Sequence, residues 1–288
     1  MPVRPAATVM IVRDGPHGDR PLEVLMVRRS LRSDFVGGAF VFPGGAVDPG
    51  DGESPCRGRT DAEASAVLGV TAGGLAYWVA GVRECFEEAG ILLTYAGEGR
   101  DLLSLADPGD AARFARRRDD LNAGRAEFAE FCRTEGLQLA ADRVHYFAHW
   151  ITPAGAPRRY DTRFFVAPLP PGQEPAHDAR ETVAATWMRP ADALASHRDG
   201  AIELIIPTIR CLQAIARFGT ADELLLAVGS AASVETVVPK VVVDGRAVRV
   251  LLPGDPGYDE ARPPPASVDV DGAVRAASRA ANPEPEPG

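Results

Sequence analysis

The segment LAYWVAGVRECFEEAG, residues 75–90, constrains the fold more than any other part of the chain. Its apolar residues recur at helical spacing: Leu75, Trp78, Val79, Val82 and Phe86. Glu84, Glu87 and Glu88 fall within an arc of about 100° on another face, and Gly90 follows as a helix-ending residue. We therefore predict a helix that packs its apolar stripe on a core and turns a carboxylate cluster outward.

Three carboxylates on one helix face repel one another by a few tenths of a kcal/mol per pair. Solvation of an acidic surface would absorb that cost, and a bound cation would remove it. Ala80 and Gly81, one turn earlier, are predicted to leave space for a ligand above the cluster.

The rest of the chain alternates strand and helix patterns, which indicates the α/β class. Strands are expected at 7–14, 21–29, 91–95, 143–153, 158–169 and 181–188, and helices at 60–70, 190–200 and 206–219. Residues 97–141 are predicted to form two amphipathic helices inserted into a sheet domain spanning 1–220. Residues 221–258 are predicted to form a β-ribbon around the Asp244-Gly245 turn, and the Pro/Ala-rich tail 259–288 is expected to be flexible.

Composition excludes several classes of function. A net charge of -9 and a pI near 5.1 argue against binding of long nucleic acid, but not against a small phosphate-bearing substrate that arrives with a divalent cation. No apolar run reaches the roughly 18 residues of a membrane span. The four cysteines are scattered, without the pattern of a zinc site or disulfide framework, so we expect a soluble cytoplasmic protein.

A glycine-rich loop, FPGGAVDPGD at 42–51, precedes the acidic helix. Together the two segments resemble the signature of the Nudix hydrolase family, G-x5-E-x7-R-E-U-x-E-E-x-G-U, where U is a bulky apolar residue. Gly45 and Asp51 match its first half, with Asp in place of Glu, and residues 83–91 match its second half without a gap. From Asp51 to Arg83 is 32 positions where the family pattern has 8, so about 24 residues are inserted and the fold must bring the two halves together.

A split signature is also found in the subgroup related to peroxisomal coenzyme A and acyl-CoA diphosphatases. The similarity covers about residues 5–218 and implies a Nudix α/β/α sandwich with a mixed β-sheet. It further implies Mg²⁺- or Mn²⁺-dependent hydrolysis of a nucleoside diphosphate linked to another moiety. Glu84, Glu87 and Glu88 would hold the metal, and Arg83 would orient a helix carboxylate through a bidentate ion pair. Glu84 competes with Glu181 and Glu174 as general base.

Substrate contacts are expected from Gly44, Gly45, Arg32, Arg158, Arg159 and Arg163. Arg29 is a further candidate, and the alternative for 158–163 is an ordinary half-buried strand with arginines on its wet face. The coenzyme A pattern R-x3-G-x3-F-P-G-G fits Gly38 and residues 42–45, but Asp34 replaces its arginine. Coenzyme A or acyl-CoA is slightly favoured, and ADP-ribose, NADH and FAD compete.

Two further questions stay open at the level of sequence. The segment 97–141 is interpreted either as a lid that sets specificity or as a homodimer surface. A Nudix-like sensor that binds a nucleotide without cleaving it is the alternative of another class, although such a module would be expected to lose its helix carboxylates.

Overall fold

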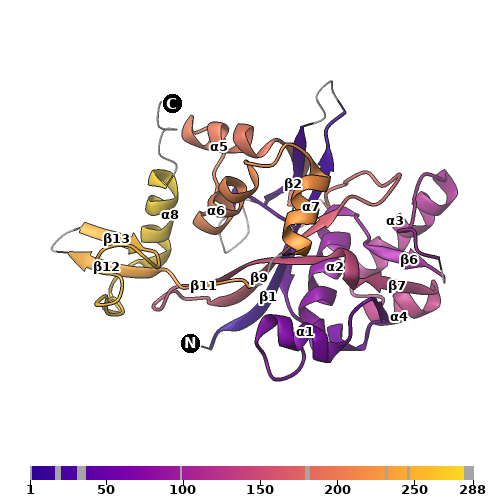
Figure 1. Cartoon of the computed structure of the whole chain (residues 1–288), viewed down its shortest axis with the longest axis horizontal. Helices are drawn as coiled ribbons and strands as arrows, with labels where there is room; N and C mark the ends of the chain where they lie inside the picture. The colour runs from indigo at the N-terminus through magenta and orange to yellow at the C-terminus, as the bar shows by residue number, and fades with distance from the viewer. Residues whose placement is uncertain are drawn as a thin grey trace.

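A mixed eight-stranded sheet forms the centre of the computed structural model, which describes residues 2–16, 21–30, 37–97, 99–178, 182–230, 233–244 and 247–281. Its main path runs β10-β2-β1-β9-β8-β11, with β3 on β2 and β4 on β1. The strands are β1 (Arg4–Asp14), β2 (Leu22–Arg29), β3 (Phe40–Val41), β4 (Gly44–Ala46), β8 (His145–Ile151), β9 (Tyr160–Pro168), β10 (Thr182–Met188) and β11 (Thr236–Val237). Helices cover both faces (Figure 1), which agrees with the predicted α/β sandwich.

Strand β1 separates two hydrophobic cores because successive side chains of a strand point to opposite faces. Ala7, Val9 and Ile11 belong to the core beneath the acidic helix, whereas Met10 and Val12 belong to the core on the other face. One edge of β1 pairs in parallel with β9, and the other edge is shared between β2 and β4. This shared edge holds the short glycine strand β4 beside the sheet centre.

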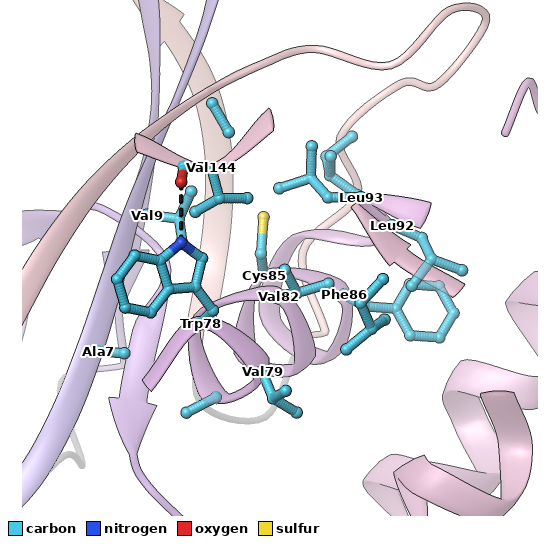
Figure 2. Close-up of a cluster of buried hydrophobic side chains, with 14 of the residues drawn as sticks. Ala7, Val9, Trp78, Val79, Val82, Cys85, Phe86, Leu92, Leu93 and Val144 are labelled. Carbon is cyan, nitrogen blue, oxygen red and sulfur yellow. Dashed lines mark hydrogen bonds between the residues drawn. The ribbon is translucent and has the colours of Figure 1, made fainter. Parts of the chain in front are cut away.

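The acidic segment forms helix α2 (Leu75–Ala89), and Gly90 ends it in the left-handed conformation, as predicted. Trp78 is buried against Phe165, and its indole N–H donates to the carbonyl oxygen of Val144 at 2.8 Å (Figure 2). The space predicted beside Gly81 does not exist. A Cβ there would lie 2.7 Å from Cγ2 of Val9, so Gly81 permits close packing of helix on sheet instead.

The predicted helices of the 97–141 region are α3 (Pro108–Asn122) and α4 (Phe128–Thr134). They pack beside α2 together with α1 (Asp61–Leu68), the short helices η1 (Asp51–Glu53) and η2 (Ala141–Arg143), and a small sheet of order β5-β7-β6. That sheet consists of β5 (Cys56–Arg57), β6 (Thr94–Ala96) and β7 (Leu137–Ala140). Of these strands only β6 corresponds to a predicted strand, the one at 91–95. Phe131 of α4 stacks on Phe86 of α2 with ring centroids 5.5 Å apart.

The opposite face of the sheet carries α5 (Pro190–Arg198), α6 (Ile206–Ile215) and α7 (Ala221–Gly229). Helix α7 was missed, because the segment was assigned to the ribbon extension. Thr220 accepts a hydrogen bond from the amide of Glu223 and so caps this helix, and buried Leu224 anchors it in the core.

The expected ribbon forms from β12 (Lys240–Asp244) and β13 (Ala247–Leu251), and its Asp244-Gly245 turn falls partly outside the described residues. The tail differs from the expected flexible chain, because residues within it form helix α8 (Val270–Ala280). Val270 packs with Val241 of the ribbon, while Val274 and Ala277 pack against the core around α6. Val270, Val274 and Ala277 recur at helical spacing, but they lie in a segment whose Pro, Ala and Asp content is typical of flexible chain, so the helix was not predicted.

No helix in the part of the chain that the structure describes has the length and apolar character needed to cross a membrane. All four cysteines are free thiols, and Cys85, Cys132 and Cys211 are buried. Burial raises the pKa of the Cys132 thiol, and the charge of Cys56 raises the same pKa further.

Candidate active site

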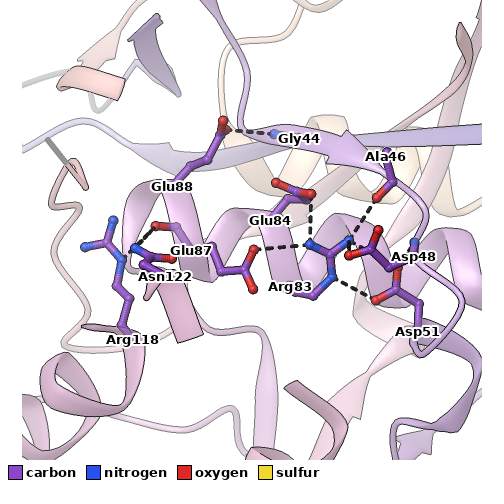
Figure 3. A network of polar contacts seen from close by, with 10 residues as sticks. All are labelled: Gly44, Ala46, Asp48, Asp51, Arg83, Glu84, Glu87, Glu88, Arg118 and Asn122. Carbon is purple, nitrogen blue, oxygen red and sulfur yellow. Dashed lines mark hydrogen bonds and ion pairs between the residues drawn. The ribbon is translucent and has the colours of Figure 1, made fainter. Parts of the chain in front are cut away.

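The two halves of the split signature meet at Arg83 (Figure 3). Its Nε donates to Oδ1 of Asp51 at 2.8 Å, and Nη2 donates to Oδ2 of the same carboxylate at 3.2 Å. Both side chains are buried, with 8% and 2% of their surfaces exposed. Tertiary folding therefore reconnects residues that lie 32 positions apart, and it does so with a bidentate ion pair.

Arg83 was expected to form a bidentate ion pair with a helix carboxylate, and this expectation is wrong because its bidentate partner is Asp51 of η1. Arg83 makes only single contacts with the helix: Nη1 lies 2.8 Å from Oε1 of Glu84 and 3.1 Å from Oε2 of Glu87. Nη2 also donates to the carbonyl oxygen of Ala46 at 2.8 Å. Arg83 thus joins η1, β4 and α2, and its guanidinium fixes the positions of both glutamates.

The electrostatics of this cluster follow from burial. Desolvation raises the pKa of Glu87, while the charge and hydrogen bond of Arg83 oppose the shift. For Arg83 itself, burial alone would lower the pKa, but the hydrogen bond that it donates to Asp51 and the charges of Glu84, Asp51 and Glu87 raise it. The guanidinium is a permanent cation among these carboxylates.

Glu88 does not join this cluster. Its side chain turns toward β4, where Oε2 accepts a hydrogen bond from the amide of Gly44 at 3.0 Å, and the residue is 4% exposed. The carboxylate face of α2 is consequently covered by β4 and η1, which corrects the expectation that it points outward. Only 15% and 23% of the Glu84 and Glu87 side chains are exposed.

The two loop glycines are required by this close approach. A Cβ on Gly45 would lie 2.3 Å from Oε1 of Glu84, and one on Gly44 would lie 2.4 Å from the carbonyl oxygen of Ala7. At Gly44 the near atoms belong to the backbone and exclude a side chain, whereas at Gly45 a side chain would require the Glu84 carboxylate to leave its position. Gly45 therefore leaves the space through which Glu84 reaches past the edge of the sheet.

A cavity of about 480 Å³ lies between the sheet, α6 and α8. Its charged lining residues are Arg29, Glu84, Glu87, Arg158, Asp271 and Arg275. Apolar and aromatic side chains, among them Phe42, Trp150, Tyr160 and Phe164, line the rest. The volume is in the range of small-molecule sites, and the cavity combines apolar walls with a few charged groups, as such sites do.

The predicted substrate arginines divide between two environments. Arg158 lines the cavity together with Gly44 and Gly45, and so does Arg29. Arg159 donates instead to the carbonyl oxygen of Thr152 at 3.1 Å and is not part of the lining. Arg32 and Glu181 lie outside the described residues, and Glu174 is exposed away from the cavity.

Arg163 is a buried structural residue rather than the predicted substrate contact. Along β9 the side chains of Tyr160, Thr162 and Phe164 face the cavity, so the two-residue period directs Arg163 to the opposite face. There it donates to Nδ1 of His149 at 3.0 Å and to the hydroxyl of Tyr146 at 2.9 Å.

Three cavity residues, Asp271, Val274 and Arg275, come from α8 and were missed. The available signal was weak: Asp271 and Arg275 are four residues apart, as on one helix face, but within a segment dominated by Pro and Ala. Conversely, no residue that lines the cavity belongs to the described part of 97–141, so the structure gives no support to a lid there.

In the described ranges, no group of three or more His, Cys, Asp or Glu side chains is arranged to hold a metal ion. The geometry above gives the reason, because Arg83 draws Glu84 and Glu87 while Glu88 turns to Gly44. The donor set is nevertheless all oxygen, which suits Mg²⁺ or Mn²⁺. Two of the three carboxylates line the cavity, so the residues present fit such a cation.

Comparison with known proteins places this arrangement in a family. The acyl-coenzyme A diphosphatase NUDT19 of Xenopus laevis is 25% identical, over 83% of this chain and 72% of that protein. Its Gallus gallus counterpart is 27% identical, over 89% and 80%. The crystal structure of a NUDIX hydrolase from Alicyclobacillus acidocaldarius superimposes with a TM-score of 0.62 at 29% identity, covering 82% of this chain and 99% of that one.

The family described as the NUDT19 Nudix domain matches residues 54–215. That match covers more than half of the 288 residues and includes the whole of α2. The protein is therefore a member of the Nudix hydrolase family, in its NUDT19 Nudix domain group.

Proposed function

We propose that the protein hydrolyses the diphosphate bond of coenzyme A or acyl-coenzyme A in a reaction that depends on Mg²⁺ or Mn²⁺. The observation that carries the proposal is the reconnected signature: Asp51 holds Arg83, and Arg83 holds Glu84 and Glu87 at the wall of a cavity. The curated relatives named above as acyl-coenzyme A diphosphatases support this choice of substrate.

Glu84 and Glu87, which line the cavity, would hold the divalent cation, and Glu88 would join them by turning its carboxylate away from the amide of Gly44. When bound, the cation would neutralise negative charge on the diphosphate oxygens and so permit attack by water. The role of Arg83 is to position Glu84 and Glu87, because its buried guanidinium contacts both side chains while Asp51 fixes its plane. The backbone of Gly44 and Gly45 lines the cavity without side chains, which lets a phosphate approach closely.

Glu84 and Glu181 remain the two candidates for the general base that removes the proton from water. Glu84 has the support of position, since it lines the cavity next to Gly45. A base must be within hydrogen-bond reach of the attacking water, so its removal should lower kcat with little change in KM. Comparing Glu84→Gln with Glu181→Gln over a range of pH would assign the role.

The substrate is tested with a panel of coenzyme A, acetyl-CoA, ADP-ribose, NADH and FAD, with product identification. All five contain an adenosine diphosphate core, so only differences in kcat/KM identify the preferred substrate. We expect coenzyme A or acetyl-CoA to have the highest kcat/KM and to release adenosine 3′,5′-bisphosphate. A clear preference for ADP-ribose or a dinucleotide would contradict the choice of coenzyme A.

The proposed chemistry is tested with the same assay on Glu87→Gln, with Glu130→Gln as the matched control. Glu130 is an exposed residue of α4 whose contacts are with Arg133 and Thr134. We expect kcat to fall at least 100-fold for Glu87→Gln and to stay unchanged for Glu130→Gln. Binding of the panel without any hydrolysis by the wild-type protein would instead support the nucleotide sensor.

The remaining expectations are part of the same proposal. The partner is a small nucleotide-type molecule rather than long nucleic acid, and the compartment is the reducing cytoplasm, where four free thiols persist. A homodimer through the 97–141 segment is testable by sedimentation of the full chain.

A further inference from the structure

Helix α8, which follows the ribbon strand β13 near the C-terminal end of the chain, supplies a wall of the proposed active site. Asp271, Val274 and Arg275 line the same cavity as Glu84 and Glu87 of α2. In Figure 1 the ribbon and α8 lie on the other side of the sheet strands β1 and β9 from α2. The cavity is therefore lined both by the signature helix α2 and by the C-terminal helix α8.

The orientation of α8 is fixed by contacts on its inner side. Val270 is buried with Ala156 and Val241, while Val274 and Ala277 pack against the core beside α6. Ser278 is 1% exposed, and its Oγ accepts a hydrogen bond from the amide of Ile206 at 3.2 Å. With these residues held, Arg275 lines the cavity, whereas Arg279, one turn further along the same helix face, lies beyond the cavity with 73% of its side chain exposed.

Charges of both signs line the cavity. Glu84 and Glu87 are the carboxylates of the signature, and the arginines Arg29, Arg158 and Arg275 come from three distant segments. Asp271 interacts with Arg275 one turn away: burial raises the pKa of this carboxyl, and the charge of Arg275 opposes that shift. The cavity thus contains cationic side chains that the metal-dependent step at α2 does not use.

We propose that Arg275, together with Arg158, binds an anionic group of the substrate other than the diphosphate that is cleaved. The inference rests on the proposed function, and within coenzyme A it identifies the group, because the ribose 3′-phosphate is the molecule's only other phosphate. Arginine suits this role, since its fork of N–H donors matches phosphate oxygens. Arg275 would then be a specificity-determining residue, and α8 would be the element that distinguishes coenzyme A from substrates without a 3′-phosphate.

The test compares kcat and KM for coenzyme A and 3′-dephospho-coenzyme A in the wild type and in Arg275→Ala. We expect Arg275→Ala to raise KM for coenzyme A about tenfold with kcat nearly unchanged, and to leave KM for the dephosphorylated substrate as it was. Arg279→Ala is the matched control, because it removes the same charge from the same helix outside the cavity. The control should leave both KM values unchanged.

Direct binding separates this inference from the proposed function. Titration calorimetry with adenosine 3′,5′-bisphosphate and with AMP needs no turnover. We expect the wild type to bind the bisphosphate more tightly than AMP, and Arg275→Ala to bind the two ligands with similar affinity. If wild type hydrolyses neither substrate yet shows this difference, the hydrolase proposal fails and the subsite stands. If Arg275→Ala keeps the wild-type preference for the 3′-phosphate, or Arg279→Ala loses it equally, the subsite is overturned.

Discussion

At the scale of single residues, the site depends on how closely backbone and carboxylates approach one another. Arg83 donates hydrogen bonds to three carboxylates and one carbonyl from a buried position, an arrangement that lysine could not reproduce because it lacks the planar fork of donors. The replacement of the signature's Glu by Asp51 is compatible with this geometry. The shorter side chain is carried by η1, whose position brings it within 2.8 Å of Arg83.

Gly45→Ala should affect activity more than stability. The added Cβ would meet the far end of the Glu84 side chain at 2.3 Å, and that flexible end can move aside at little cost in folding free energy but only by leaving its present position. We expect kcat to fall at least tenfold, with a thermal midpoint close to that of the wild type. Gly50→Ala is the control, because Gly50 has a helical backbone and no atom within 4 Å of an added Cβ. Equal activity of the two variants would argue against the role of Gly45.

At the scale of elements, α2 is held from two sides. Its apolar stripe packs on β1, and the α3–α4 region packs against its C-terminal half. Arg118 and Asn122 of α3 donate to the carbonyl oxygen of Glu87 at 3.0 and 3.1 Å. The inserted segment therefore supports α2 from behind, a role that differs from both alternatives proposed from the sequence, a lid and a homodimer surface.

Phe131→Ala should destabilise this support. Phe131 is 4% exposed and contacts the rings of Phe86, Phe114 and Phe128, so truncation leaves a cavity among aromatic side chains. We expect the free energy of unfolding, measured in urea, to fall by about 3 kcal/mol. Leu226→Ala, at a residue that is 78% exposed, should change it by less than about 0.5 kcal/mol. A similar small change for both variants would show that the α4 contact is dispensable.

At the scale of the whole molecule, the C-terminal segment is integrated with the sheet domain. His197 of α5 accepts the amide proton of Leu204 at Nδ1, so its Nε2 proton is available to donate to the carbonyl oxygen of Ser278 at 2.9 Å. Together with the bond between Ile206 and Ser278, this joins α5, α6 and α8 at one buried point. The cavity lies beside this junction, so its shape depends on segments from both ends of the chain.

Ser278→Ala tests that junction. The substitution leaves the buried amide of Ile206 without its acceptor, and we expect a loss of about 2 kcal/mol in the free energy of unfolding. Ser230→Ala is the control, because that exposed hydroxyl only bonds carbonyls at the end of its own helix. If the two variants unfolded at the same urea concentration, the junction would not hold α8 in place.

The sequence by itself determined the elements whose information is local. The apolar period of residues 75–90 and the final Gly90 predicted α2, and the spacing of Arg83, Glu84, Glu87 and Glu88 predicted the family and its chemistry. Runs of branched apolar residues on either side of a Gly/Pro/Asp turn likewise predicted β1 and β2. In each case the signal is carried by neighbouring residues and needs no knowledge of the fold.

Only the tertiary structure decided which distant residues share the site. It placed Asp51 on Arg83, turned Glu88 to Gly44, put Arg163 on the opposite face of β9, and brought Arg275 into the cavity. The physical reason is that these outcomes depend on strand register and on packing between segments far apart in the chain. Those contacts leave no periodic pattern in the sequence, so they become visible only when the sheet, α2 and α8 are assembled.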